Sequence, residues 1–224
     1  MKQILLFDID GTLLHVNKSF TKQLFLEIAN ELNITFSHMK NSSFAGRTDK
    51  DIFEELASVH PQSDLFYDEL KQCYLEYMNN YFMTEHVSAI EGAVEAVCSA
   101  WEKGYKVGLC TGNFRETAYL KVHAAGLTDI FGFGGFGCMH SDRIYIPNDA
   151  HHEFVEKFGF RPEPEHYVVI GDTPNDIRCA KYFGAVSLAV STGSYSNNDL
   201  EKANPDILLS DLFNIQEQLD RYFD

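Results

Sequence analysis

The stretch Ile4-Leu5-Leu6-Phe7-Asp8-Ile9-Asp10-Gly11-Thr12 decides the fold of this chain. Its first four residues are all apolar, which is typical of a strand buried on both faces of a parallel sheet. Two carboxylates, Asp8 and Asp10, follow the strand at once. Ligands in an open α/β sheet bind beyond the carboxyl ends of the strands. The stretch therefore predicts a central strand with acidic chemistry at its carboxyl end.

Similar apolar runs recur along the chain with helical segments between them. The runs cover residues 105–110, 167–170, 186–190 and 207–209. In the segment 92–103, Val94, Val97 and Trp101 share one helical stripe. Asn113 is expected to cap a helix that ends at Gly126, and Thr173 with Pro174 to open one that ends near Gly184. Strands that alternate with helices predict βαβ units and a doubly wound parallel sheet.

Residues 15–85 follow a different pattern. Their apolar residues recur at helical spacing, and no buried strand is evident there. We expect an α/β core made of residues 1–14 and 86–224, with a helical cap inserted at residues 15–85.

Composition limits the partners. The 224 residues contain 33 Asp plus Glu against 18 Lys plus Arg, a formal net charge of -15. Nucleic acid and anionic membrane surfaces are therefore disfavoured as partners. Five cysteines without a C-x-x-C pair, and no signal or transmembrane segment, predict a cytoplasmic protein with reduced thiols. The oligomeric state is left open between monomer and homodimer.

Polar clusters follow three of the expected strands. They are Asp8-Ile9-Asp10, Thr111-Gly112-Asn113 and Gly171-Asp172 with Asp176. Parallel strands would bring these clusters to one crevice. Several carboxylates held within a few ångströms repel one another unless a cation lies among them. Mg²⁺ is the usual cation beside a substrate phosphate, so we expect a Mg²⁺ site.

Such a site suits phosphoryl transfer. A carboxylate can attack phosphorus to form an aspartyl-phosphate, which water then hydrolyses. A second carboxyl group two residues further on can protonate the leaving oxygen and then deprotonate the water. The Thr111 hydroxyl and nearby backbone N–H groups are natural donors to the phosphate.

Taken together, the three clusters resemble motifs one, two and four of the haloacid dehalogenase (HAD) superfamily. The resemblance covers essentially the whole chain, because a helical insert after motif one is similar to the C1 cap of the phosphoglycolate-phosphatase-like branch. It implies a Rossmannoid three-layer core, a mobile cap and a Mg²⁺-dependent phosphatase acting on a small phosphorylated metabolite. Phosphoglycolate is one candidate substrate among many.

The resemblance also implies roles for individual residues. Asp8 would be the nucleophile and Asp10 the general acid/base. The phosphoryl group would be held by Thr111 with Gly112 and Asn113. The metal ligands would be Asp8, Asp172 and the backbone carbonyl of Asp10, with Asp176 supporting the metal site.

Two positions need a separate interpretation. The family's third motif is usually a Lys, but residues 141–147 contain none. Arg143 is our candidate for that role, since a guanidinium can screen the same charges, and Lys157 is the rival. Arg47 lies in Gly46-Arg47-Thr48-Asp49 of the insert, where it would meet an anionic or polar end of the leaving group. The alternative is that these residues form an ordinary interhelical turn.

Other patterns are given weaker interpretations. Gly132 to Gly137 matches G-x-G-x-x-G, but no helix follows, so we expect a short strand or turn rather than a dinucleotide site. His123, His140, His151 and His152 are expected to be surface or capping residues rather than metal ligands.

Three other functions compete with a phosphatase. A phosphomutase would use the same residues and return the phosphoryl group to a sugar. A haloacid dehalogenase would have little use for Asp10 or for Asp172 and Asp176. A non-catalytic regulatory protein of this fold is expected to have lost the nucleophile or a metal ligand, and this chain retains Asp8, Asp10 and Asp172.

Overall fold

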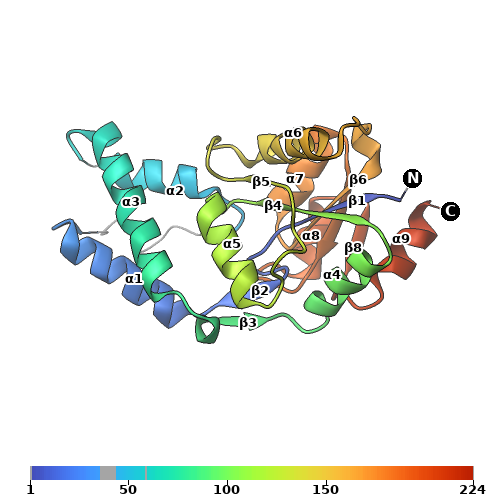
Figure 1. Cartoon of the computed structure of the whole chain (residues 1–224), viewed down its shortest axis with the longest axis horizontal. Helices are drawn as coiled ribbons and strands as arrows, with labels where there is room; N and C mark the ends of the chain where they lie inside the picture. The colour runs from blue at the N-terminus through green and yellow to red at the C-terminus, as the bar shows by residue number, and fades with distance from the viewer. Residues whose placement is uncertain (1, 36–43, 59, 224) are drawn as a thin grey trace.

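The computed structural model describes residues 2–35, 44–58 and 60–223 (Figure 1). Its centre is a six-stranded sheet in the order β5-β4-β1-β6-β7-β8, in which every neighbouring pair is parallel. The strands are β1 (Ile4–Phe7), β4 (Lys106–Thr111), β5 (Gly134–Phe136), β6 (Tyr167–Gly171), β7 (Val186–Val190) and β8 (Ile207–Leu209). The predicted α/β class with a parallel sheet is confirmed.

The register of the central strands aligns their carboxyl ends. Phe7 at the end of β1 pairs with Leu109 of β4 on one side and Ile170 of β6 on the other. The polar residues that follow each strand therefore emerge at one edge of the sheet. This shared edge carries the candidate site.

Alternate residues of β1 face opposite layers of helices. Leu5 and Phe7 belong to a core cluster with residues of α4, α5 and α9. Ile4 and Leu6 belong to a second cluster with residues of α6 and α7. Side chains of a strand point alternately to its two faces, so an unbroken apolar run covers both. The helices are α4 (Ala93–Glu102), α5 (Arg115–Ala124), α6 (Ile146–Phe158), α7 (Pro174–Phe183), α8 (Asn197–Lys202) and α9 (Ile215–Phe223).

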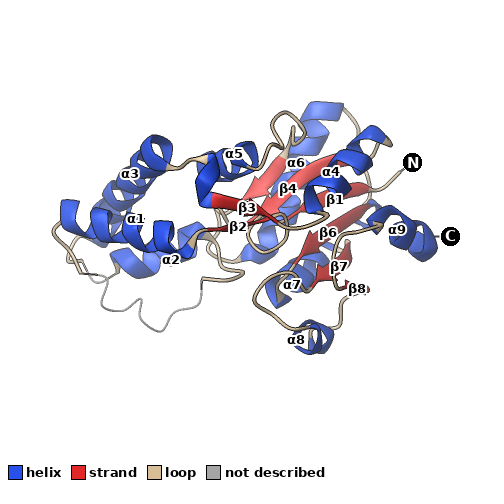
Figure 2. Cartoon of the chain, turned by 90° about the horizontal axis from the view of Figure 1, so that it is seen from below, coloured by secondary structure: helices blue, strands red, loops and turns tan. Residues whose placement is uncertain are grey.

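Three helices between β1 and α4 form a separate cluster to one side of the sheet (Figures 1 and 2). They are α1 (Lys18–Glu31), α2 (Asp49–Ala57) and α3 (Ser63–Tyr81), and we call them the helical insert. Two short antiparallel strands, β2 (Leu14–Val16) and β3 (Val87–Ala89), carry the chain out of the core and back. The insert has its own apolar cluster, which Ala124 of α5 and Phe114, the residue before that helix, complete. The division into domains stays a prediction.

Some local predictions hold and others fail. Thr173 caps α7 in a capping box with Asp176, and Gly184 ends that helix with φ +90°. By contrast, Trp101 is 54% exposed, because the buried face of α4 shares Val97 with the expected stripe but otherwise consists of Ala93, Ala96 and Ala100. None of the helices that the structure describes combines the length and apolar character needed to cross a membrane.

Candidate active site

Three buried aspartates gather at the carboxyl edge of the sheet. Asp8 follows β1, Asp172 follows β6, and Asp176 lies in the first turn of α7. Each can offer one carboxylate oxygen so that the three oxygens lie within 4.8 Å of one another. Asp176 is fixed by its own helix, because its Oδ2 accepts hydrogen bonds from the Thr173 backbone N–H and hydroxyl at 3.0 and 2.7 Å.

Crowding and burial disfavour ionisation of these carboxyl groups. Burial, with the nearby carboxylates, raises the pKa of Asp8 to about 6 and that of Asp172 to about 8. Gly11 and Gly193 pack closely against the Asp172 carboxylate. A Cβ atom added to Gly11 would lie 2.5 Å from Asp172 Oδ2, and one added to Gly193 would lie 1.7 Å from the same oxygen. A cluster of buried carboxylate oxygens is the donor set that a hard divalent cation takes, so these residues fit Mg²⁺.

Arg143 lies beside two members of the cluster. Its Nη2 is 2.9 Å from Asp8 Oδ1 and 2.5 Å from Asp176 Oδ1, and it donates to the Cys110 carbonyl oxygen at 3.2 Å. The Arg143 side chain is 4% exposed. Lys157, the rival for this position, is exposed and donates to the carbonyl oxygen of Gly132 at 2.8 Å. The structure thus brings Arg143, and not Lys157, to the aspartates.

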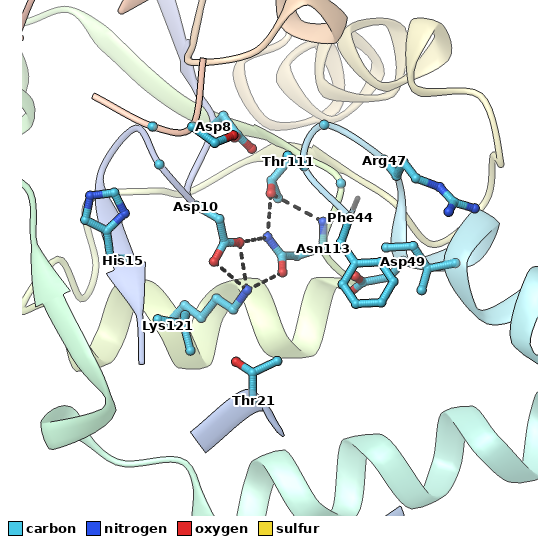
Figure 3. Close-up of a pocket in the computed structure, with 18 of the residues that line it drawn as sticks. Asp8, Asp10, His15, Thr21, Phe44, Arg47, Asp49, Thr111, Asn113 and Lys121 are labelled. Carbon is cyan, nitrogen blue, oxygen red and sulfur yellow. Dashed lines mark hydrogen bonds and ion pairs between the residues drawn. The ribbon is translucent and has the colours of Figure 1, made fainter. Parts of the chain in front are cut away.

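The side chains of Lys121 and Asn113 contact the carboxylate of Asp10 (Figure 3). Lys121 of α5 places Nζ 2.9 and 2.7 Å from the two carboxylate oxygens of Asp10 and donates to Asn113 Oδ1 at 2.6 Å. The Asn113 amide in turn donates to Asp10 Oδ2 at 2.7 Å and to Thr111 Oγ1 at 2.8 Å. The Asp10 carboxylate is therefore held by one lysine and one amide.

The expected helix-capping role of Asn113 is wrong. The N-cap of α5 is Phe114, and the side chain of Asn113 points to Asp10 and Lys121 instead. The backbone N–H of Phe114 donates to Asp49 Oδ2 of the insert at 2.7 Å. Burial raises the pKa of Asp49 to about 6, against the lowering effect of Lys121.

The loop that leads into α2 is hydrogen-bonded to the core. Asp49 donates its backbone N–H to the Gly112 carbonyl oxygen at 2.6 Å, and Lys50 donates to that of Gly137 at 3.1 Å. Thr48 Oγ1 reaches the carbonyl oxygen of Ser141 at 3.0 Å. The fit is close, because a Cβ at Gly112 would lie 2.1 Å from the Arg47 carbonyl oxygen.

These elements enclose a cavity of about 640 Å³. Of the residues predicted for the site, all but Asp176 line it: Asp8, Asp10, Arg47, Thr111, Gly112, Asn113, Arg143 and Asp172. Thr111 is fully buried. Arg47 points its guanidinium away from Asp8 and Asp10 (Figure 3), and pairs with Asp51 and Glu55 of α2, each at 2.6 Å.

Sequence reasoning missed two residues of the site, Lys121 and Asp49. Both contact residues far away in the chain, and within the stretch Gly46-Arg47-Thr48-Asp49 only Arg47 was expected at the site. No local signal marks Lys121, because its helix also carries Arg115, Glu116 and His123. The interpretation of the histidines also needs one correction, since His151 is buried and its Nδ1 lies 3.0 Å from the Tyr167 hydroxyl. The Gly-rich stretch forms β5, as expected for a short strand.

Comparisons with known proteins agree with this arrangement. Residues 5–190 match the profile of the family described as haloacid dehalogenase-like hydrolase. Pyrophosphatase PpaX of Anoxybacillus flavithermus is 26% identical over 216 residues, which cover 94% of this chain and 95% of that protein.

Solved structures with the same fold are more distant in sequence. A predicted phosphatase from Clostridium acetobutylicum superposes with a TM-score of 0.72 at 18% identity, covering 99% of each chain. A predicted phosphoglycolate phosphatase from Haemophilus somnus gives 0.68 at 18% identity, covering 97% and 98%. The β-phosphoglucomutase of Clostridium difficile gives 0.70 at 15% identity, covering 100% and 99%.

Proposed function

Because the chain belongs to the haloacid dehalogenase-like hydrolase family, we propose that it is a Mg²⁺-dependent phosphatase that hydrolyses a small phosphomonoester metabolite. The observation that carries the proposal is the buried cluster of Asp8, Asp172 and Asp176, of which Asp8 and Asp172 line the cavity. A relative named a pyrophosphatase and a fold neighbour named a predicted phosphoglycolate phosphatase support the reaction class.

In the first step, Asp8 attacks phosphorus. An Asp8 carboxylate oxygen forms a bond to phosphorus as the bond from phosphorus to the leaving oxygen breaks, which gives an aspartyl-phosphate. The carboxyl group of Asp10 gives its proton to the leaving oxygen. Lys121 and Asn113 hold Asp10 in place for this transfer.

In the second step, water releases the phosphate. The Asp10 carboxylate takes a proton from the water, whose oxygen attacks phosphorus and frees Asp8. Arg143 stabilises the charge on Asp8 and the phosphoryl oxygens, and Thr111, Gly112 and Asn113 supply donors to those oxygens. Mg²⁺ held by Asp8, Asp172 and the Asp10 carbonyl, with Asp176 in support, would screen the negative charge between the carboxylates and the phosphate.

The cellular setting follows from the same features. All five cysteines are free thiols, which supports a reducing compartment such as the cytoplasm. The net charge of -15 supports a small metabolite over a polyanion as substrate. We propose that the helical insert is the cap that covers the substrate.

A hydrolysis assay tests the proposal. We expect phosphate release from a generic aryl phosphate with Mg²⁺, little release with EDTA, and none above background for Asp8→Asn. Asp64→Asn, at an exposed position of α3, is the matched control and should behave as wild type. Activity that survives either EDTA or Asp8→Asn would refute the mechanism. Transfer to a bound sugar without phosphate release would instead identify a phosphomutase.

A further inference from the structure

Resting on the proposed function, we propose that the natural substrate is a phosphomonoester whose leaving group is a largely apolar ring. The cavity has an acidic, polar end at Asp8 and an apolar end formed by the insert. The apolar end is lined by Phe20, Phe25, Phe44, Phe53, Tyr74 and Met78. A phosphoryl group attacked by Asp8 therefore directs its leaving group towards these side chains.

Four aromatic residues of this wall, Phe25, Phe44, Phe53 and Tyr74, are connected by ring contacts. The Phe25 ring lies 6.2 Å from that of Phe44 and 6.1 Å from that of Tyr74, both nearly parallel to it. The Phe53 ring meets Tyr74 edge-on at 5.0 Å. The Tyr74 hydroxyl is bonded to Thr117, so Tyr74 faces the cavity as an apolar surface. Aromatic surfaces of this kind favour stacked or edge-on contact with another ring.

The charged groups near the apolar end do not suit an anionic leaving group. Arg47 pairs with Asp51 and Glu55, and Lys121 pairs with Asp10. Asp10 and Asp49 add carboxylates to the lining of the cavity. A carboxylate or a second phosphate placed beside these aromatic side chains would lose its hydration. Among the described residues that line the cavity, the cation without an ion pair is Lys18, which lies at the exposed edge.

The size of the cavity agrees with a ring-sized leaving group. Its volume of about 640 Å³ falls within the range of about 300–1,000 Å³ that is typical of sites for drug-sized ligands. The exposed side chains of His15 and Lys18 lie at its edge, where a polar substituent of the ring could meet them. Pyrophosphate and phosphoglycolate would leave the aromatic wall uncovered.

Three phosphate esters of primary alcohols test the proposal, since their leaving oxygens are alike. They are benzyl phosphate, ethyl phosphate and 2-phosphoglycolate. We expect kcat/KM for benzyl phosphate to exceed that for ethyl phosphate by at least about ten-fold, with 2-phosphoglycolate the poorest. Pyrophosphate is included as a fourth substrate and should be hydrolysed no faster than ethyl phosphate.

One variant locates the preference in the cavity. Phe44 lies in the loop before α2 and is partly buried, so Phe44→Ala spares the buried helix contacts. We expect it to lower kcat/KM for benzyl phosphate about ten-fold and to leave ethyl phosphate within about two-fold. Leu65→Ala, at a 69% exposed site on α3, is the matched control and should change neither value.

Binding of non-hydrolysable analogues separates this inference from the proposed function. With Mg²⁺, calorimetry should give benzylphosphonate a Kd at least about ten-fold below that of ethylphosphonate, whether or not any ester turns over. Equal affinities, failure of both phosphonates to bind, or a preference for 2-phosphoglycolate or pyrophosphate would overturn the inference. A phosphatase that hydrolyses ethyl phosphate and depends on Asp8 would keep its proposed function in each of these cases.

Discussion

Replacing Arg143 by Met removes the one cation that the described structure places against the buried aspartates. Arg143 Nη2 is 2.9 Å from Asp8 Oδ1 and 2.5 Å from Asp176 Oδ1. The three side chains are between 2% and 6% exposed, so water cannot replace the guanidinium. Removing one partner of a buried ion pair costs about 3–5 kcal/mol, because the remaining charge is left uncompensated. We expect Arg143→Met to lower the free energy of unfolding by about 3–5 kcal/mol at pH 8.

The loss should depend on pH. The guanidinium lowers the pKa of Asp8, which is about 6 in its presence, so the pKa of Asp8 is higher still in Arg143→Met. A carboxyl group whose pKa is raised in the folded state binds a proton there that the unfolded chain has released. Stability of the variant therefore falls as pH rises from about 4 through the folded pKa of Asp8. We expect the deficit relative to wild type to be smaller at pH 5 than at pH 8.

Urea unfolding of the metal-free protein at pH 5 and pH 8 measures both effects. Lys157→Met is the matched control, since Lys157 is exposed and, within the described part of the chain, its hydrogen bond goes to the Gly132 carbonyl oxygen. It should change stability by less than about 0.5 kcal/mol. Arg143→Lys should keep part of the stability, because it retains a charge with a different geometry. If Arg143→Met is as stable as Lys157→Met at pH 8, the ion pairs are absent in solution.

Three further predictions concern the acid/base group, the metal and the insert. Lys121→Met should lower kcat about ten- to a hundred-fold by freeing the Asp10 carboxylate, and Lys121→Arg should restore part of it; an effect on KM alone would contradict this. The pKa of Asp172 is raised to about 8, so metal-free stability should fall as pH rises from about 4 to 8. Mg²⁺ should therefore raise Tm more at pH 8 than at pH 5.5, and an equal gain at both would count against Mg²⁺ binding there. Gly112→Ala places a Cβ 2.1 Å from the Arg47 carbonyl oxygen, so urea unfolding should show that the free energy of unfolding falls by about 1–3 kcal/mol. An unchanged free energy of unfolding would mean that the loop before α2 does not lie against Gly112 in solution.

The meeting of Asp8 with Asp172 could be predicted from the sequence. Each follows a buried apolar run, and parallel strands in register carry both residues to one edge of the sheet. The start of α7 was equally accessible, because Thr173, Pro174 and Asp176 encode a capping box within four residues. In both cases the deciding interactions are local or follow from strand direction alone.

Contacts across the fold could not be predicted in the same way. Asn113 has the residue type of a helix cap, but its amide bonds to Asp10, 103 residues away in the sequence. Lys121 reaches Asp10 across 111 residues, and no local pattern distinguishes it from a solvated lysine. The choice between Arg143 and Lys157 likewise needed the tertiary structure, since both are basic residues in the correct part of the chain.

The attachment of the insert to the core has a consequence for evolutionary change. Asp49 and Lys50 donate backbone N–H groups to the carbonyl oxygens of Gly112 and Gly137, and the Gly46 carbonyl oxygen accepts from Asn175. On the insert side, all three bonds use main-chain atoms. Every residue type has a carbonyl oxygen, and every residue type except proline has a backbone N–H. These three bonds therefore persist when side chains in this loop vary, whereas the bonds of the Thr48 and Asp49 side chains to Ser141 and Phe114 depend on residue type. If the insert contacts the leaving group as proposed, descendants of such a protein could exchange one leaving group for another by substitution in the insert, without losing these main-chain bonds to the core.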